Sequence, residues 1–263
     1  MIADLALARR LENGEVRNGL ECTEAQNLLR PETRSLALPV CGGYALYVGR
    51  LSPLTHAVGL GLNGPVREAE LERMEAFFRS RGAVVTIDLC PLANPMLLEF
   101  LSLRGYRLAE FNNVLVKPLA AGDPVPVAGV RPAEPEESEL WAVTAGRGFF
   151  EDKPLTEEEL DVGRNIFRMA SSTCYLACLE DGTPRASAAL ATYDGLAMLF
   201  ADGTLPSARR QGAQTALIRA RLQDAARRGC DLATASTLPG SISQRNYERC
   251  GFQVVYTRAI LAG

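Results

Sequence analysis

The sequence has a single histidine, His56, and no uninterrupted apolar run near the roughly 20 residues that a membrane-spanning helix requires. Zinc sites usually combine histidine with paired cysteines, and His56 is far in sequence from Cys174 and Cys178, so no metal site is predicted. The seven cysteines are odd in number and are not spaced as in a disulfide framework. No cleavable signal pattern is present. We therefore expect a cytoplasmic protein with reduced thiols and no membrane partner.

The sequence also lacks an excess of positive charge. Residues 1–123 carry 13 basic and 14 acidic side chains, and residues 124–263 carry 15 and 17. Proteins that bind nucleic acids normally present a basic surface, so we expect no nucleic-acid partner. Only Lys117 and Lys153 are lysines, which makes the many arginines weak evidence for anion binding in general.

The C-terminal half alternates strand and helix patterns. Asp-Gly pairs at 181–182 and 194–195 are typical of tight turns between strands, and Thr156 followed by acidic residues is typical of a helix start. Gly229 and Gly251 indicate helix ends. In chain order the patterns predict strand 129–132, helices 134–145 and 156–169, strands 175–179, 185–192 and 196–202, helix 215–228, strand 232–236, helix 241–250 and strand structure over 252–261.

The N-terminal half repeats the later part of this order. Its patterns predict strands 45–48 and 56–62, helix 68–81, strand 84–87, helix 95–104 and strand 106–116. Gly82 matches Gly229 at an offset of 147, and Gly105 matches Gly251 at an offset of 146. Helix ends that recur at offsets differing by a single residue indicate an internal duplication. We expect an α/β (α+β) protein with two mixed-sheet domains and flanking helices, residues 1–120 and 125–263, joined by a Pro/Ala/Gly-rich linker within 119–128.

One segment of the C-terminal half is suited to binding an anion. The loop Arg209-Arg210-Gln211-Gly212-Ala213-Gln214 connects the predicted strand 196–202 to the helix that follows. A glycine-bearing turn at a helix start offers unpaired backbone N–H groups and the positive end of the helix dipole to a phosphate. The two arginines add charge at the same place.

Together with Pro206 and the segment Tyr247-Glu248-Arg249-Cys250-Gly251-Phe252, this loop resembles the acyl-CoA-binding core of the GNAT N-acyltransferases, whose pyrophosphate loop is Gln/Arg-x-x-Gly-x-Gly/Ala. The resemblance covers residues 129–260 well and 40–117 loosely. One position departs from the family pattern, because Gln214 replaces the last Gly/Ala and its side chain must point away from the phosphates. The resemblance implies two GNAT-like domains in tandem, with acetyl-CoA as co-substrate and no metal.

The resemblance also implies which residues contact the co-substrate. Main-chain groups of Asp202, Gly203 and Thr204 are expected to pair with the pantetheine arm, and the pyrophosphate contacts are expected from Arg209, Arg210, Gln211, Gly212, Ala213, Gln214 and Thr215. Tyr247 occupies the family's position for a tyrosine near the CoA sulfur and is our candidate proton donor to the departing thiolate.

For the missing asparagine and for the general base, the sequence offers several candidate residues. The family's asparagine seven residues before the tyrosine is Gly240 here, so Ser241 or Ser243 are candidates to replace it, and Asn246 is interpreted as solvent-facing. Candidates for the general base are Asp202, Asp231 and the acidic residues Glu157, Glu158, Glu159 and Asp161. Carboxylates facing the acceptor would favour a cationic amine.

The corresponding segment of the N-terminal half, residues 63–70, is unsuited to a pyrophosphate. Pro65 removes one backbone donor, and Glu68 and Glu70 place negative charge at the helix start. We predict that this half is a degenerate GNAT-like domain without a CoA loop.

The sequence therefore predicts an N-acetyltransferase that transfers an acetyl group from acetyl-CoA to an amine of a small molecule or peptide, as a monomer or homodimer. Two alternatives remain. A CoA-binding regulatory or scaffold protein would share the loop without turnover. Another acyl donor, such as succinyl-CoA, would share the nucleotide end that the loop contacts.

Overall fold

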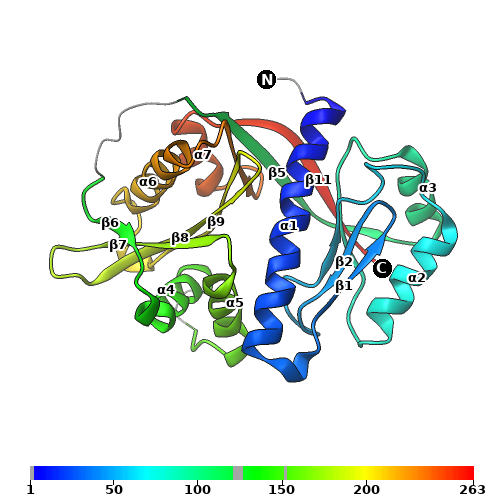
Figure 1. Ribbon diagram of the computed structural model, residues 1–263, viewed down its shortest axis with the longest axis horizontal. Helices are drawn as coiled ribbons and strands as arrows, with labels where there is room; N and C mark the ends of the chain where they lie inside the picture. The colour runs from blue at the N-terminus through cyan, green and yellow to red at the C-terminus, as the bar shows by residue number, and fades with distance from the viewer. Residues whose placement is uncertain (1–2, 121–126, 151–152) are drawn as a thin grey trace. The chain divides into compact units, whose positions relative to one another are not determined.

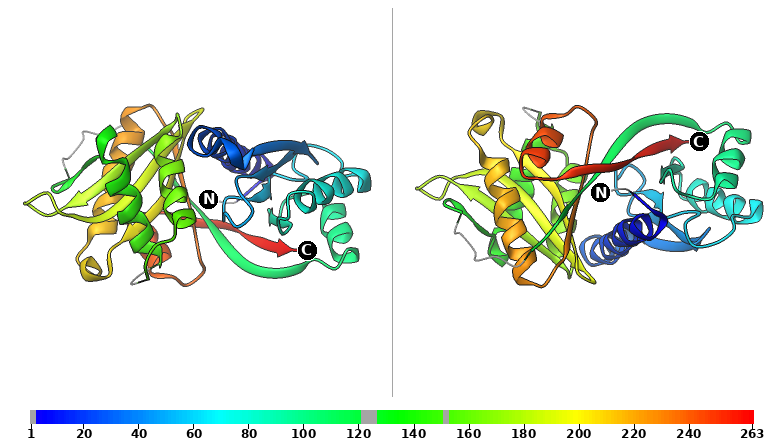
Figure 2. Two further views of the ribbon diagram at one scale, coloured as in Figure 1. Left: turned by 90° about the horizontal axis from the view of Figure 1, so that it is seen from below. Right: turned by 90° about the horizontal axis from the view of Figure 1, so that it is seen from above.

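The structure, a computed structural model, describes residues 3–120, 127–150 and 153–263, so part of the predicted linker lies outside the described residues. The chain forms two compact units. Unit 1 comprises Met1–Val114, Thr237–Pro239 and Val254–Gly263, and unit 2 comprises Leu115–Ser236 and Gly240–Gln253. Both units combine helices with strands of a mixed sheet (Figures 1 and 2), as the sequence predicts.

Unit 2 has the strand order β5-β10-β9-β8-β7-β6. Its strands are β5 (Arg107–Pro118, in this unit from Leu115), β6 (Val130–Pro132), β7 (Ser172–Cys178), β8 (Pro184–Tyr193), β9 (Leu196–Thr204) and β10 (Leu232–Thr237, in this unit up to Ser236). Strands β6 to β9 pair antiparallel with their neighbours, whereas β9 and β10 run parallel. A parallel pair needs a crossover connection, which helix α6 (Ala213–Arg227) supplies.

Helices cover both faces of the unit 2 sheet (Figure 2). Helices α4 (Ser138–Phe150) and α5 (Glu157–Arg168) lie on one face, and α6 and α7 (Ile242–Arg249) lie on the other. Thr156 caps α5, because its Oγ1 accepts a hydrogen bond from the Glu159 N–H at 3.2 Å. The predicted helix start is confirmed.

Glu137 anchors the short turn that leads into α4. Its carboxylate accepts hydrogen bonds from both terminal nitrogens of Arg131, at 2.6 and 2.7 Å, and from the Glu134 N–H. The bonds from Arg131 and then from the backbone lower the pKa of Glu137 to about 2. A carboxyl whose pKa is lower in the folded than in the unfolded chain stabilises the protein above its unfolded pKa, and this contribution is lost as the pH falls toward the folded value.

We therefore expect Glu137→Gln to lower the free energy of unfolding at pH 7 by about 1 kcal/mol or less, because the ion pair is partly exposed. Near pH 2, where the Glu137 carboxyl is about half protonated, the effect of the substitution should be much smaller. Urea unfolding of the variant and the parent at both pH values measures the difference, with Glu136→Gln as the control. A loss of equal size at the two pH values would contradict the assignment.

Unit 1 has the strand order β1-β2-β3-β4-β11-β5. Its elements are α1 (Leu5–Leu29), β1 (Leu36–Val40), β2 (Gly43–Tyr47), β3 (His56–Val58), α2 (Glu68–Arg79), β4 (Thr86–Leu89), α3 (Pro95–Leu103), β5 up to Val114 and β11 (Gln253–Ala262) from Val254. No helix or strand was predicted for residues 1–44, so α1 and β1 are new. Val16 of α1 packs on Leu46 and Val58, whereas α2 and α3 bury their apolar residues in a separate cluster.

The two pairs of helices that suggested a duplication end in the same way. Gly82, Gly105, Gly229 and Gly251 follow α2, α3, α6 and α7 with φ of 65°, 78°, 79° and 91°. The N–H of the next residue donates to the carbonyl five residues earlier, as from Ala83 to Phe78 and from Cys230 to Ala225. This is the Schellman ending that a left-handed glycine allows. The predicted helix ends are confirmed.

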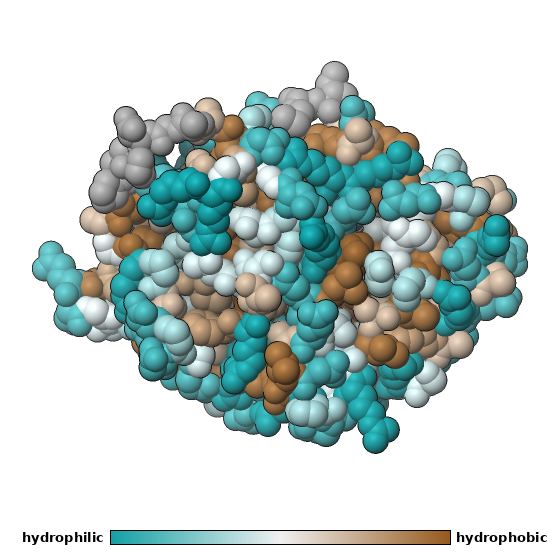
Figure 3. Space-filling view, viewed as in Figure 1, coloured by the Kyte–Doolittle hydropathy of each residue, from teal (hydrophilic) through white to brown (hydrophobic). Residues whose placement is uncertain are grey.

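None of the helices in the described part of the chain is long and apolar enough to cross a membrane. The face drawn in Figure 3 carries hydrophilic residues between its hydrophobic ones.

Candidate functional site

The site begins where two parallel strands of unit 2 separate. Strands β9 and β10 pair from Leu196 and Leu232 to Met198 and Thr234. β9 continues to Thr204 and β10 to Thr237 without further pairing between them. The carboxyl ends of these strands therefore leave backbone groups that a ligand can reach, as is common at such edges of α/β sheets.

A β-bulge turns β9 at the point where it leaves β10. Ala189 of β8 pairs with Phe200, and Ser187 pairs with Gly203, so β9 has one more residue than β8 in this interval. Ala201 within it has a φ of 54°, a left-handed conformation that is unusual for alanine. Bulges bend the strand that carries them. Asp202, Gly203 and Thr204 of the predicted pantetheine segment follow this bend.

The predicted pyrophosphate loop lies open to solvent at the start of α6. Arg209, Arg210, Gln211 and Gly212 are exposed. Gly212 precedes the helix with a φ of 81°, and a Cβ placed on it would meet nothing within 4 Å. No side chain caps this helix.

The helix start has available hydrogen-bond donors. Within the described ranges, the N–H groups of Ala213, Gln214 and Thr215 have no hydrogen-bond acceptor, and the first bond of α6 runs from Ala216 N–H to Gly212 O at 2.9 Å. Unpaired donors at the positive end of a helix dipole are suited to an anionic ligand.

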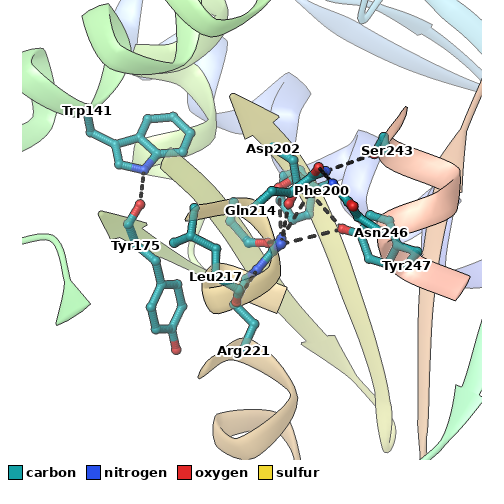
Figure 4. A network of polar contacts seen from close by, with 11 residues as sticks. Trp141, Tyr175, Phe200, Asp202, Gln214, Leu217, Arg221, Ser243, Asn246 and Tyr247 are labelled. Atoms are coloured by element: carbon teal, nitrogen blue, oxygen red, sulfur yellow. Dashed lines mark hydrogen bonds and ion pairs between the residues drawn. The ribbon is translucent and has the colours of Figure 1, made fainter. Parts of the chain in front are cut away.

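Gln214 points toward α7, as its departure from the loop pattern requires (Figure 4). Its Nε2 donates to Ser243 Oγ at 2.9 Å, and its Oε1 accepts from Asn246 Nδ2 at 2.7 Å. The interpretation of Asn246 as only a solvent-facing residue is therefore wrong. Ser241 caps α7 by accepting a hydrogen bond from the Gln244 N–H.

Asp202, Arg221 and Tyr247 form a polar cluster behind the diverging strands (Figure 4). Both terminal nitrogens of Arg221 donate to the Asp202 carboxylate, and the Tyr247 hydroxyl donates to Asp202 Oδ2 at 2.7 Å. Arg221 also donates to the Tyr247 hydroxyl at 3.5 Å. The structure thus joins Tyr247 directly to Asp202, which the sequence placed in the same site, and adds an arginine that sequence reasoning missed.

The Tyr247 side chain is buried, at 1% exposed, with its ring edge-on to Phe252 at a centroid distance of 5.0 Å. Burial, followed by the charge of Asp202, raises the pKa of Tyr247 well above its ordinary value. The hydroxyl therefore keeps its proton at physiological pH.

Of the four acidic residues considered for the acceptor side, Glu157, Glu159 and Asp161 already have hydrogen-bond partners. Arg164 of α5 donates to Glu139, Glu157 and Asp161 at 2.7 to 2.9 Å. Glu159 belongs to the cap of α5. This local neutralisation gives no support to a cationic acceptor. No cluster of metal-ligating side chains occurs in the residues that the structure describes.

In unit 1 the residues directly after β3 are packed, whereas residues 63–65 and 67–69 of the corresponding segment are exposed and a Cβ on Gly64 would meet nothing within 4 Å. After β3, a Cβ on Gly59 would lie 2.8 Å from Val16 Cγ2, and one on Gly61 would lie 3.2 Å from Leu97 Cδ2. Gly61 N–H donates to Cys41 O, and Gly61 O accepts from Asn94 N–H. Helix α1 and the start of α3 therefore occupy the space beside residues 59–61.

Known proteins resemble this chain at two levels, a family match within the C-terminal half and solved structures over most of the chain. Residues 139–252 match the acetyltransferase (GNAT) family. The chain is similar to a GCN5-related N-acetyltransferase from Kribbella flavida, at a TM-score of 0.63 and 24% identity over 92% of this chain and 95% of that one. It is also similar to a tandem GNAT protein from the clavulanic acid biosynthesis pathway, at 0.59 and 17% over 83% and 77%.

A putative GNAT acetyltransferase from Novosphingobium aromaticivorans gives a TM-score of 0.55 at 17% identity over 93% of this chain and 98% of that one. No curated protein matches the chain. At these identities the solved structures establish the fold. The chain therefore has the fold of tandem GNAT proteins, and its residues 139–252 match the GNAT acetyltransferase family.

Proposed function

We propose that this protein is an acetyl-CoA-dependent N-acetyltransferase acting on an amine of a small molecule or peptide, with the catalytic site in residues 125–263. The observation that carries the proposal is the open start of α6, where Gly212 and three unpartnered N–H groups lie close in sequence to the diverging end of β9. Residues Arg209 to Thr215 bind the diphosphate, and main-chain groups of Asp202, Gly203 and Thr204 pair with the pantetheine arm.

The proposed reaction needs one proton at the sulfur. The neutral amine attacks the thioester carbon, the C–S bond breaks, and the thiolate accepts a proton while the new amide loses one. Tyr247 donates to the thiolate. The raised pKa makes the Tyr247 phenol a weaker acid. The negative charge of Asp202 would also raise the pKa of a thiol formed beside it, so the thiolate would bind a proton more tightly.

Tyr247→Phe should lower kcat by about 100-fold and change the KM for acetyl-CoA by less than about threefold, because the phenol acts in the transfer step rather than in binding. Tyr175→Phe is the matched control, since this phenol is also buried in unit 2 but bonds to Asp224. Steady-state thiol release measures both variants. Full activity of Tyr247→Phe would remove the residue from the mechanism.

We further propose that residues 1–120 form a degenerate domain that does not bind CoA. The helix start of α2 has Glu68 and Glu70 in its first turn, and the Glu70 carboxylate accepts a hydrogen bond from the Cys41 N–H at 3.1 Å. A carboxylate there opposes a phosphate.

Calorimetric titration with acetyl-CoA, followed by a thiol-release assay over a panel of amines, tests the function. We expect one binding event per chain and turnover with at least one amine. Binding without turnover on any amine would favour the regulatory or scaffold alternative. Absence of binding would overturn the proposal. Titration with succinyl-CoA in parallel tests the choice of acyl group.

A further inference from the structure

Arg221 is a fully buried arginine, at 0% exposed, to which the proposed reaction assigns no step. It lies on α6 within an apolar stripe that includes Leu217, Ile218 and Ala225, all buried. Its Nε donates to Leu217 O of its own helix at 3.1 Å. The remaining guanidinium donors leave the helix and reach the sheet and α7.

Two of these bonds reach the strands beside the bulge. Arg221 Nη1 donates to Ala189 O of β8 at 2.9 Å and to Phe200 O of β9 at 3.3 Å. Ala189 and Phe200 are cross-strand partners at the last regular position before the extra residue of β9. A bulge disrupts the hydrogen-bond ladder around it. Arg221 supplies donors to carbonyls of both strands at this interruption.

The other bonds reach the side chains that follow the bulge. Asp202, at the bend of β9, accepts from both Nη atoms of Arg221, and Tyr247 of α7 lies within hydrogen-bond distance of both partners. A single guanidinium group therefore connects α6, β8, β9 and α7 (Figure 4).

Burying a charge at this position carries a desolvation cost in free energy. Removing a guanidinium group from water costs several kcal/mol unless it is fully paired, and an apolar residue would fill a place on this stripe without that cost. The five N–H groups of the guanidinium match acceptors in a fixed fork that lysine does not reproduce. This geometry favours a role in shaping the bulge over a role in stability alone.

We propose that Arg221 is a positioning residue, which replaces the ladder hydrogen bonds lost at the β9 bulge and fixes Asp202 and Tyr247 for acyl transfer. The inference rests on the proposed function for its kinetic consequence. Its structural consequence, that Arg221 holds residues 200–203 in their bent conformation, does not depend on acetyl-CoA.

The first test is hydrogen exchange of Arg221→Lys, with Arg227→Lys on the exposed side of α6 as the matched control. Amides of residues 199–204 should exchange at least about tenfold faster in Arg221→Lys, while those of β7 keep their rates. A uniform acceleration throughout unit 2, or unchanged exchange at 199–204, would overturn the proposal. If Arg221→Lys does not fold, Asp202→Asn serves as the second variant, with the same local acceleration expected.

The second test is a kinetic cycle of Arg221→Lys, Tyr247→Phe and the double variant. Arg221→Lys should lower kcat by about 30-fold and, because the main chain of residues 202–204 also pairs with the pantetheine arm, should weaken the calorimetric Kd for acetyl-CoA by a smaller factor, up to about tenfold. Because Arg221 acts through Tyr247, the double variant should be within about threefold of the slower single variant. Multiplicative effects, or a loss confined to acetyl-CoA affinity, would refute the positioning role. A parent protein that fails to bind acetyl-CoA would refute the proposed function and leave the exchange result to decide on Arg221.

Discussion

Gly212→Asp should weaken acetyl-CoA binding by about 100-fold or more. Gly212 precedes α6 in a left-handed conformation, and its Cβ position faces open space, so the new carboxylate would lie at the proposed diphosphate site. Two like charges about 4 Å apart repel by about 4 kcal/mol at an effective dielectric constant of about 20. Each 1.4 kcal/mol corresponds to about tenfold in Kd. Calorimetric titration at fixed ionic strength measures the change.

Gly212→Asn is the matched control, because asparagine tolerates left-handed φ as well as aspartate does but adds no charge. We expect it to weaken binding by less than about tenfold. Gly229→Asp introduces the same acid at the far end of α6, also at a left-handed glycine with open space, and should leave binding unchanged. Equal losses in Gly212→Asn and Gly212→Asp would show that charge is irrelevant there and would contradict a phosphate site.

Asp202→Ala should lower the free energy of unfolding by about 3–5 kcal/mol, because it leaves the buried Arg221 cation without its carboxylate partner. Glu157→Ala provides the comparison. Glu157 is an exposed partner of Arg164, which retains Glu139 and Asp161, so its loss should cost about 0.5 kcal/mol or less. Urea unfolding monitored by circular dichroism measures both.

The double variant Asp202→Ala/Arg221→Met distinguishes an unpaired charge from lost packing. Removing both partners of a buried ion pair is often close to neutral, so the double variant should recover much of the stability that Asp202→Ala loses. A double variant as unstable as the single one would show that the carboxylate stabilises the fold by other contacts.

Local signals predicted most of the elements of the C-terminal half. Asp-Gly turns separate the antiparallel strands, Thr156 begins α5, and glycines end α6 and α7 in left-handed conformations. These features depend on neighbouring residues, so the sequence displays them directly. The open loop at Gly212 was recognised for the same reason, since a glycine between a strand and a helix is a local pattern.

Features that depend on distant residues were not predicted. Helix α1 has only a weak apolar face, and its buried Glu12 bonds to Tyr256 and Arg258 at the other end of the sequence. The bulge of β9 leaves no local sequence mark. Arg221 did carry a signal, an arginine within an apolar helical stripe, but its acceptors on β8, β9 and α7 become visible only in the folded chain.

Because β11 belongs to unit 1, this unit cannot complete its sheet until β11 has been synthesised. Residues 259–262 pair with β4, so the edge of β4 that they occupy has no such neighbour while the rest of the chain is being translated. Domains that are contiguous in sequence can fold as they emerge from the ribosome. Here the sheet of the N-terminal unit can be completed only after more than a hundred intervening residues have been synthesised. Its last folding step therefore closes a long loop, and the edge of β4 stays unpaired until then.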